Sequence, residues 1–224
     1  MRRCEDRELM DAPDATDEDL AQSYLELHRT NTWLGNTGAM LRLLRQNPQP
    51  IQRVLDIGCG HGALLGEIRE EFDVEAVGMD LRPAPPNAPI QILTGNAVTD
   101  KLPKADVAVC MMMAHHLSEL ELAGMIRNVS RSCQRFIVLD LVRHQVPLAL
   151  FRAFVSPLLS RVNALDGQTS IRRAYMPAEM HRIVEGALTS GSRPVSRLRH
   201  TVSLLWIRQV VDILWEPAEI GNQY

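Results

Sequence analysis

The sequence predicts an α/β fold in which a mainly parallel sheet is covered by helices on both faces. Between residues 52 and 141, short apolar runs that suit buried strands alternate with amphipathic segments that suit helices. The first apolar run ends in a glycine-rich turn, Val54-Leu55-Asp56-Ile57-Gly58-Cys59-Gly60-His61-Gly62. Glycines at alternate positions let the backbone approach a ligand, so this turn indicates a pocket for a cofactor.

Length and composition narrow the class of protein. At 224 residues the chain fits one large domain, and its net charge of −3 gives no basic surface for nucleic acid. Its four cysteines form no C-x-x-C pair, which indicates neither a metal site nor disulfides and favours a cytoplasmic location. The sequence shows no signal peptide and no apolar run that could span a membrane. We therefore expect no metal, nucleic acid or membrane partner.

The elements follow in order from the N-terminus. Residues 17–46 predict helix, which Gly35 and Gly38 divide in two, and the prolines at 48 and 50 end the second part. Strands are expected at 52–57, 74–79, 90–93, 105–111 and 135–141, with helices at 61–71 and 118–132. Ser118-Glu119-Leu120-Glu121 is a capping-box pattern that marks the start of the second of these helices. Four prolines between 81 and 89 predict that the helix after the second strand is short or absent.

The alternation stops after the fifth strand. Residues 147–176 are apolar, basic and aromatic, and they predict a helix over 148–163, a turn at Asp166-Gly167 and then an extended stretch. An insertion of this length usually carries specificity. Pro177 predicts the start of a helix over 177–187, and strands at 194–200 and 203–210 lie close enough to pair as a hairpin.

The glycine spacing indicates which cofactor binds. A dinucleotide fingerprint reads G-x-G-x-x-G, whereas this turn reads G-x-G-x-G, and Asp56 would repel a pyrophosphate but attract a cation. A second acid, Asp80, ends the next apolar run, where a carboxylate can accept hydrogen bonds from ribose hydroxyls. Here the sequence resembles the class I S-adenosylmethionine-dependent methyltransferases, whose first motif is D-x-G-x-G-x-G.

The resemblance implies a Rossmann-like fold with seven strands in the order 3-2-1-4-5-7-6, the last of them antiparallel. It implies S-adenosylmethionine as cofactor, with S-adenosylhomocysteine as product. By the matching motifs, the turn around Asp56 would surround the methionine moiety, Asp80 would bind the ribose, and Asn96 with Ala97 would meet the adenine. The full set of expected cofactor residues is Asp56, Gly58, Cys59, Gly60, Gly62, Asp80, Leu81, Asn96, Ala97, Cys110 and Met111.

Three histidines are candidates for a catalytic base. The end of the fourth strand, His115-His116-Leu117, resembles the H-H-L of many of these enzymes, although either histidine could simply order the loop. His144 follows the fifth strand, and ligands bind at the carboxyl ends of parallel strands. A base matters most for a phenolic acceptor, because phenols hold their proton at neutral pH. His144 is the leading candidate, with an exposed loop histidine as the alternative.

Aromatic residues gather in the N-terminal helices and in the insertion, where a lid over the acceptor would lie. Trp33, Phe151, Phe154 and Tyr175 are the expected acceptor contacts, although the same rings could instead hold the lid together. Arg173 could bind an acceptor carboxylate or phenolate, or could pair with Asp140 or Asp166. Arg172-Arg173-Ala174-Tyr175-Met176-Pro177 resembles a segment of a bacterial subgroup of small-molecule, secondary-metabolite methyltransferases.

We therefore expect a single methyltransferase domain over 1–224, acting as monomer or homodimer. Its parts would be an N-terminal helical lid (17–46), a cofactor-binding core (52–142), a substrate-side insertion (147–176) and a last helix with a strand hairpin (177–210). The expected reaction moves a methyl group to a small aromatic or polyketide-like acceptor, on oxygen. C-methylation of a quinone or phenol and a non-catalytic S-adenosylmethionine-binding partner subunit remain open. The motifs of nucleic-acid methyltransferases are absent, and glycine spacing disfavours a nicotinamide oxidoreductase.

Overall fold

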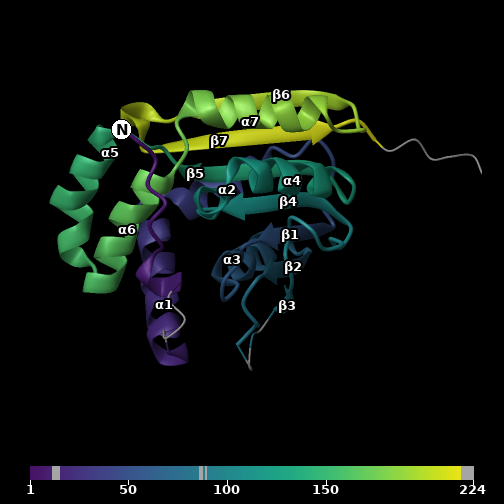
Figure 1. Ribbon diagram of the computed structural model, residues 1–224. Helices are drawn as coiled ribbons and strands as arrows, with labels where there is room; N and C mark the ends of the chain where they lie inside the picture. Colours follow the sequence, from purple (N-terminus) through teal and green to yellow (C-terminus); the bar gives the residue numbers. More distant parts are fainter. Residues whose placement is uncertain (12–15, 86–87, 89, 218–224) are drawn as a thin grey trace, which may run out of the picture.

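A seven-stranded sheet forms the centre of the computed structural model, which describes residues 1–11, 16–85, 88 and 90–217 (Figure 1). The strand order is β3-β2-β1-β4-β5-β7-β6, and β7 runs antiparallel to both of its neighbours. This is the order and the antiparallel last strand that the resemblance implies. The strands are β1 Arg53–Ile57, β2 Glu75–Asp80, β3 Gln91–Thr94, β4 Ala105–Met111, β5 Cys133–Leu141, β6 Val195–Val202 and β7 Arg208–Trp215.

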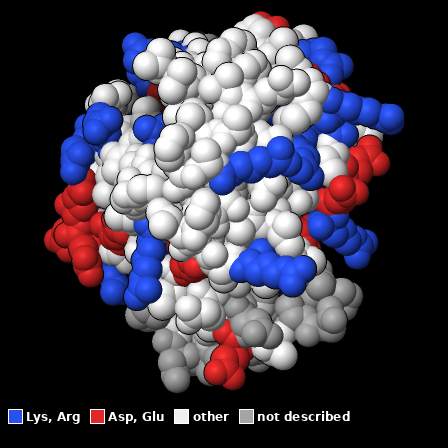
Figure 2. Space-filling view, turned by 90° about the vertical axis from the view of Figure 1, so that its left-hand side faces the viewer, with Lys and Arg blue, Asp and Glu red and all other residues white. Residues whose placement is uncertain are grey.

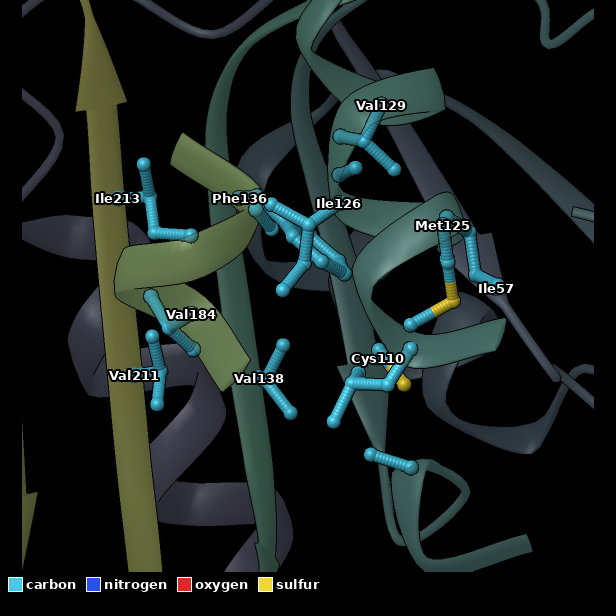
Figure 3. Close-up of a cluster of buried hydrophobic side chains, with 14 of the residues drawn as sticks. Ile57, Cys110, Met125, Ile126, Val129, Phe136, Val138, Val184, Val211 and Ile213 are labelled. Atoms are coloured by element: carbon cyan, nitrogen blue, oxygen red, sulfur yellow. The ribbon is translucent and has the colours of Figure 1, made fainter. Parts of the chain in front are cut away.

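Two pairs of helices cover the sheet. Helices α2 (Asn36–Arg45) and α3 (Ala63–Phe72) pack on one face, and α4 (Glu119–Ser130) and α7 (Pro177–Thr189) pack on the other. Strand β5 is buried on both faces of the sheet. Phe136 and Val138 pack in the core beneath α4 and α7 (Figure 3), and Ile137 packs in the core beneath α2. A central parallel strand buries both of its sides, and its sequence is therefore continuously apolar.

The first five predicted strands are confirmed to within about two residues. The capping box is also confirmed, since Ser118 Oγ accepts the Glu121 N–H at 3.3 Å and Glu121 Oε2 accepts the Ser118 N–H at 2.8 Å. As predicted, the described residues between 81 and 90 contain no helix, while 86, 87 and 89 lie outside the described part of the chain.

The N-terminal helix divides at one glycine rather than two. Helix α1 (Asp17–Trp33) ends before Gly35, whose φ of +74° turns the chain into α2, and Gly38 lies inside α2. The last strand begins five residues later than predicted. Leu205 and Trp206 have φ values of +60° and +58°, and they fold residues 204–206 into a turn before pairing begins at Arg208.

The insertion is helical throughout most of its length, so the predicted turn at Asp166-Gly167 and the extended stretch are wrong. Helix α5 (Gln145–Leu150) continues as a π-helical turn over Phe151–Val155 and a 3-10 turn over Ser156–Leu158, and α6 (Arg161–Arg173) follows. A Cβ on Gly167 would collide with the Phe151 ring, so this glycine allows close packing inside a helix. The buried Asp166 carboxylate accepts the backbone N–H groups of Leu9 (2.6 Å) and Met10 (2.9 Å).

Helices α1, α5 and α6 lie side by side beyond the carboxyl ends of the parallel strands (Figure 1). The N-terminal segment, residues 3–10, runs between this layer and the sheet. The layer and the segment together enclose the edge of the sheet where parallel folds of this type bind ligands.

Candidate active site

Two adjoining cavities lie at the carboxyl ends of the strands. We name them by one lining residue each: the Asp80 cavity, of about 470 Å³, and the Phe151 cavity, of about 480 Å³. The residues that line both are Glu8, Tyr24, Leu27, Gly58, Gly60, Met112 and His116. The shared wall contains the glycine turn, so a ligand on that turn can reach both cavities.

The glycine turn is held between β2 and α1. Gly60 has a φ of +54°, and its N–H donates to Asp80 Oδ2 at 2.8 Å. A Cβ on Gly60 would lie 2.7 Å from the Tyr24 ring, which packs directly against the turn. Asp80 Oδ1 accepts the Arg82 N–H at 3.0 Å, so the carboxylate orders the segment that follows β2 as well as the turn.

Asp56 gives the Phe151 cavity a buried acid. Its residue surface is only 3% exposed, and burial together with the nearby Asp80 raises the pKa of the Asp56 carboxyl well above its usual range. A cation in the cavity would favour the ionised form. The carboxyl is therefore placed to bind a positively charged ligand.

Most of the other expected cofactor residues line one of the two cavities. Cys59 and Met111 line the Phe151 cavity, and Leu81, Asn96 and Ala97 line the Asp80 cavity. Gly62 precedes α3 as its N-cap and lines neither cavity.

The Asn96 side chain also has a structural role. Its Oδ1 accepts the Val98 N–H at 2.9 Å, and the backbone N–H of Asn96 donates to Asp100 Oδ2 at 2.8 Å. These bonds order the loop after β3. One lone pair of Oδ1 remains available, so a contact with adenine stays a prediction.

Cys110 is not a pocket residue. It is fully buried and lines neither cavity, and its side chain points into the core between β4 and Met125 (Figure 3). The alternation of side chains along β4 explains the correction, because Met111 then faces the opposite side and reaches the cavity.

His115 is a buried, paired histidine at the wall of the Phe151 cavity. Its Nδ1 lies 2.7 Å from Asp140 Oδ1, and its backbone N–H donates to Asp140 Oδ2 at 2.7 Å. Burial opposes a charge on the ring, but Asp140 and Glu8 outweigh burial and raise the pKa of His115 to about 10. At neutral pH this ring already holds its proton, so it is not a base in the form seen here.

Glu8 and His116 lie beside His115. Glu8 Oε1 lies 3.5 Å from His115 Nε2 and 3.6 Å from His116 Nε2. Burial alone would raise the pKa of Glu8, but His115, together with His116 and Ser170, outweighs burial and lowers the pKa. Together the three side chains form a polar cluster at the boundary of the two cavities, which we call the Glu8 cluster.

His144 does not lie at either cavity, although it was the leading candidate for a base. It is the N-cap of α5, where Nδ1 accepts the Val146 N–H at 3.2 Å, and its ring stacks on Trp206 at 5.2 Å. The chain leaves β5 toward the β6–β7 hairpin, so a position after the strand end is not enough to reach the ligand.

Only one of the four expected aromatic contacts lines a cavity. Phe151 does, whereas Trp33 and Phe154 are 62% and 66% exposed and line neither. Tyr175 is buried in the core, where its hydroxyl donates to the Leu117 carbonyl at 2.7 Å and its ring lies 4.0 Å from the Arg3 guanidinium. These three residues are therefore corrections to the predicted acceptor site.

Arg173 borders the Asp80 cavity but serves to hold the N-terminal segment. Its guanidinium donates to the backbone carbonyls of Asp6 (3.2 Å) and His116 (3.1 Å). The predicted pairing with Asp140 or Asp166 is wrong, since the acids make other contacts. Asp140 binds His115, and Asp166 binds the 3-10 turn at Leu9–Asp11.

Glu8 is a site residue that was not predicted from the sequence. It lies before the first predicted helix in a polar stretch, and nothing in its spacing marks it as buried. Its position depends on Ser170 in α6, whose hydroxyl donates to Glu8 Oε1 at 2.6 Å, and on Asp166 one turn earlier. A helical assignment for 161–173 would have placed these two polar side chains on one face.

Comparison with known proteins agrees with this fold. The methyltransferase domain family matches residues 27–151. More than half of the chain is matched, and the chain belongs to this family. A search of curated protein sequences finds no match.

Solved structures share the fold at low sequence identity. The plantazolicin methyltransferase BpumL in complex with S-adenosylhomocysteine superposes with a TM-score of 0.66 at 12% identity, over 90% of this chain and 91% of that chain. The plantazolicin methyltransferase BamL, with a triazolic desmethyl analogue and S-adenosylhomocysteine, gives 0.68 at 12%, over 88% and 90%. Human N-acetylserotonin methyltransferase with S-adenosylmethionine gives 0.59 at 12%, over 89% and 56%. The fold is thus that of the S-adenosylmethionine-dependent methyltransferases.

Proposed function

We propose that the chain transfers a methyl group from S-adenosylmethionine to a small aromatic or polyketide-like acceptor, on oxygen, as in the secondary-metabolite subgroup. The observation that carries this proposal is the Phe151 cavity, a second cavity of about 480 Å³ that shares the glycine turn with the Asp80 cavity. Its size falls within the range of small-molecule sites, about 300–1,000 Å³. Its apolar wall includes Leu25, Leu27, Leu34, Leu64, Met111, Met112, Leu141, Phe151 and Ile171.

The residues present fit the cofactor. The buried Asp56 carboxyl suits a ligand with a sulfonium and an ammonium, and Gly60 leaves the turn without a side chain at its closest approach to Tyr24. Asp80 ends β2 at the Asp80 cavity, where it can accept ribose hydroxyls, and Asn96 and Ala97 line the same cavity. When bound, S-adenosylmethionine supplies a methyl group already activated by the sulfonium.

The protein's contribution is to align the acceptor with that methyl group. Helices α1 and α6 and Phe151 hold the acceptor, and a favourable alignment is equivalent to an effective molarity of about 10⁵–10⁸ M. The lid segment 17–46 and the insertion 147–176 supply these walls. We propose that, with the core and the final hairpin, they form one methyltransferase domain.

An acceptor hydroxyl would face the Glu8 cluster. Glu8 and His116 border both cavities and can receive the hydroxyl proton, whereas the proton already on His115 keeps that ring from acting as base at neutral pH. His116 is therefore the histidine that we propose as base in place of His144.

The charge pattern on one face of the molecule favours a small acceptor over nucleic acid. On the face that carries α1, α5 and α6, basic and acidic side chains are interspersed and uncharged residues cover the centre (Figure 2). A nucleic-acid site would require clustered lysine and arginine. No helix in the described part of the chain is long and apolar enough to cross a membrane.

Calorimetry followed by mass spectrometry tests the proposal. Titration with S-adenosylmethionine, S-adenosylhomocysteine and NAD should show binding of the two sulfur nucleotides only, and failure of both to bind would overturn it. A panel of phenols should then yield products heavier by one methylene that have lost phenol reactivity. Products that keep their phenol reactivity would show transfer to carbon, and cofactor binding without turnover on any acceptor would favour a non-catalytic partner subunit.

A further inference from the structure

The Glu8 cluster has the composition of a metal site. Glu8, His115 and His116 come from two distant parts of the chain, and one ligand atom from each lies within 4.8 Å of the others. Two imidazoles and a carboxylate are the ligands of many catalytic Zn²⁺ sites. The N-terminal segment supplies the carboxylate, so the cluster exists only in the folded chain.

The distances from the Glu8 oxygen to the two histidine nitrogens are close to those in such a site. In a tetrahedral site with bonds of about 2.0–2.1 Å, neighbouring donor atoms lie about 3.3 Å apart. Glu8 Oε1 lies 3.5 Å from His115 Nε2 and 3.6 Å from His116 Nε2. Small side-chain shifts would bring both nitrogens to bonding distance.

Hydrogen bonds behind the cluster orient two of the three ligands. His115 Nδ1 lies 2.7 Å from the Asp140 carboxylate, so that Nε2 points away from Asp140 and toward Glu8. Metal-binding histidines characteristically donate their second N–H to a carboxylate in this way. The Ser170 hydroxyl donates to Glu8 Oε1 at 2.6 Å and fixes the carboxylate in turn.

The buried nitrogen of His115 makes no hydrogen bond. The side chain is only 3% exposed, and within the described residues Nε2 has no hydrogen-bond partner, with Glu8 Oε1 lying 3.5 Å away. A buried polar atom without a partner is costly. A divalent cation bound to Nε2 would give this buried atom a partner.

We propose that Glu8, His115 and His116 bind a divalent cation of the Zn²⁺ class, with a fourth position open to the Phe151 cavity. All three residues line that cavity, and sites with three protein ligands and one open position are the catalytic kind. An acceptor oxygen in the open position would have its hydroxyl pKa lowered by the cation. This goes beyond the proposed function, in which His116 acts as base without a metal.

Metal titration of the full chain tests the site without reference to activity. Protein purified with a chelator should bind one equivalent of Zn²⁺ in calorimetry and melt at a higher temperature when it is present. Glu8→Gln and His116→Ala should each weaken Zn²⁺ binding by at least about 10–100-fold, the loss typical even of groups behind the ligands. Cobalt(II) should give the visible bands of a four-coordinate site without the near-ultraviolet band of a thiolate ligand.

A surface pair provides the matched control. His181 Nε2 lies 3.1 Å from Glu185 Oε1 on the exposed face of α7, so His181→Ala removes a histidine–carboxylate pair outside the cluster and should leave Zn²⁺ binding unchanged. Circular dichroism of the metal-free variants checks that each one folds. Zn²⁺ binding that survives both cluster substitutions, a thiolate band, or no binding by the folded parent would each overturn the proposal, and none of them bears on S-adenosylmethionine binding.

Discussion

Tyr24 lies over Gly60, where the backbone has a φ of +54° and a Cβ would come within 2.7 Å of the ring. Gly60→Val should therefore displace either the turn or Tyr24 and reduce S-adenosylmethionine binding at least tenfold, which calorimetry would measure. Gly66→Ala is the control, because nothing lies within 4 Å of its added Cβ inside α3. It should preserve binding and stabilise the fold by about 0.5–1 kcal/mol. Normal binding by Gly60→Val would contradict the assignment of the turn.

Asp56 should make cofactor affinity depend on pH. Burial and Asp80 raise its pKa in the free protein, whereas a sulfonium favours the carboxylate and lowers the pKa on binding. Affinity for S-adenosylmethionine should therefore rise with pH as the free carboxyl ionises, by up to about tenfold per pH unit. Because the pKa of Asp56 is higher in the ligand-free fold than in the unfolded chain, the free energy of unfolding should fall as pH rises above the pKa of the unfolded chain.

The effect of Asp56 ionisation is isolated by the ratio of the dissociation constants for S-adenosylmethionine and S-adenosylhomocysteine. S-adenosylhomocysteine lacks the sulfonium charge, so its affinity should vary less with pH than that of S-adenosylmethionine. Asp56→Asn keeps the shape of the side chain and should make the ratio independent of pH. An unchanged pH profile in this variant would assign the dependence to another group.

A buried ion pair joins the antiparallel strand β7 to its neighbour β5. Arg135 on β5 is 1% exposed, and it binds Asp212 on β7 through Nε at 2.7 Å and through its terminal nitrogen at 2.9 Å. Asp212→Asn leaves a buried guanidinium without its counterion and should lower the free energy of unfolding by about 3–5 kcal/mol in urea denaturation. The exposed pair Arg53–Glu75, at 2.6 Å, is the comparison. Glu75→Gln should change stability by about 1 kcal/mol at most.

Helix α6 packs closely against Phe151 at Gly167, and a substitution there should affect both stability and acceptor binding. Gly167→Ala would push the added methyl into the ring, which also lines the Phe151 cavity. Overpacking of this kind costs about 1–3 kcal/mol. We expect a lower melting temperature and, because the ring moves, a raised KM for the acceptor with little change in cofactor affinity. Gly186→Ala in α7, where nothing lies within 4 Å, should show neither effect.

Helices and strands whose pattern depends on neighbouring residues could be predicted from the sequence, whereas those determined by contacts with distant residues could not. The capping box at Ser118 and the apolar runs of β1 to β5 depend on neighbouring residues, and both were confirmed. Asp166-Gly167 has the composition of a turn, yet a distant ring and a distant backbone segment place it inside a helix. The same reason explains the site: the glycine motif is local, but Glu8 and Tyr24 join it through tertiary packing.

Over the whole molecule, the N-terminal segment connects parts that the sequence separates widely. Arg3 donates to the carbonyls of Arg173, His115 and Leu117 at 2.6, 3.1 and 2.7 Å, and Asp166 holds Leu9 and Met10. Asp166→Ala should release residues 3–10, and hydrogen exchange should accelerate there and in the Glu8 cluster together. Acceleration confined to α6 would show that the segment is held independently of Asp166.

The course of this segment bears on how the protein should be handled. Within residues 3–10, Glu8 lines both cavities and Arg7 and Met10 line the Asp80 cavity, whereas Trp215 ends β7 at the opposite end of the sheet (Figure 1). An affinity tag or immobilisation point at the amino end would thus pull on the segment that supplies Glu8 to the Glu8 cluster. Biosensor chips, display fusions and purification handles are better joined after Trp215, where they leave ligand entry undisturbed.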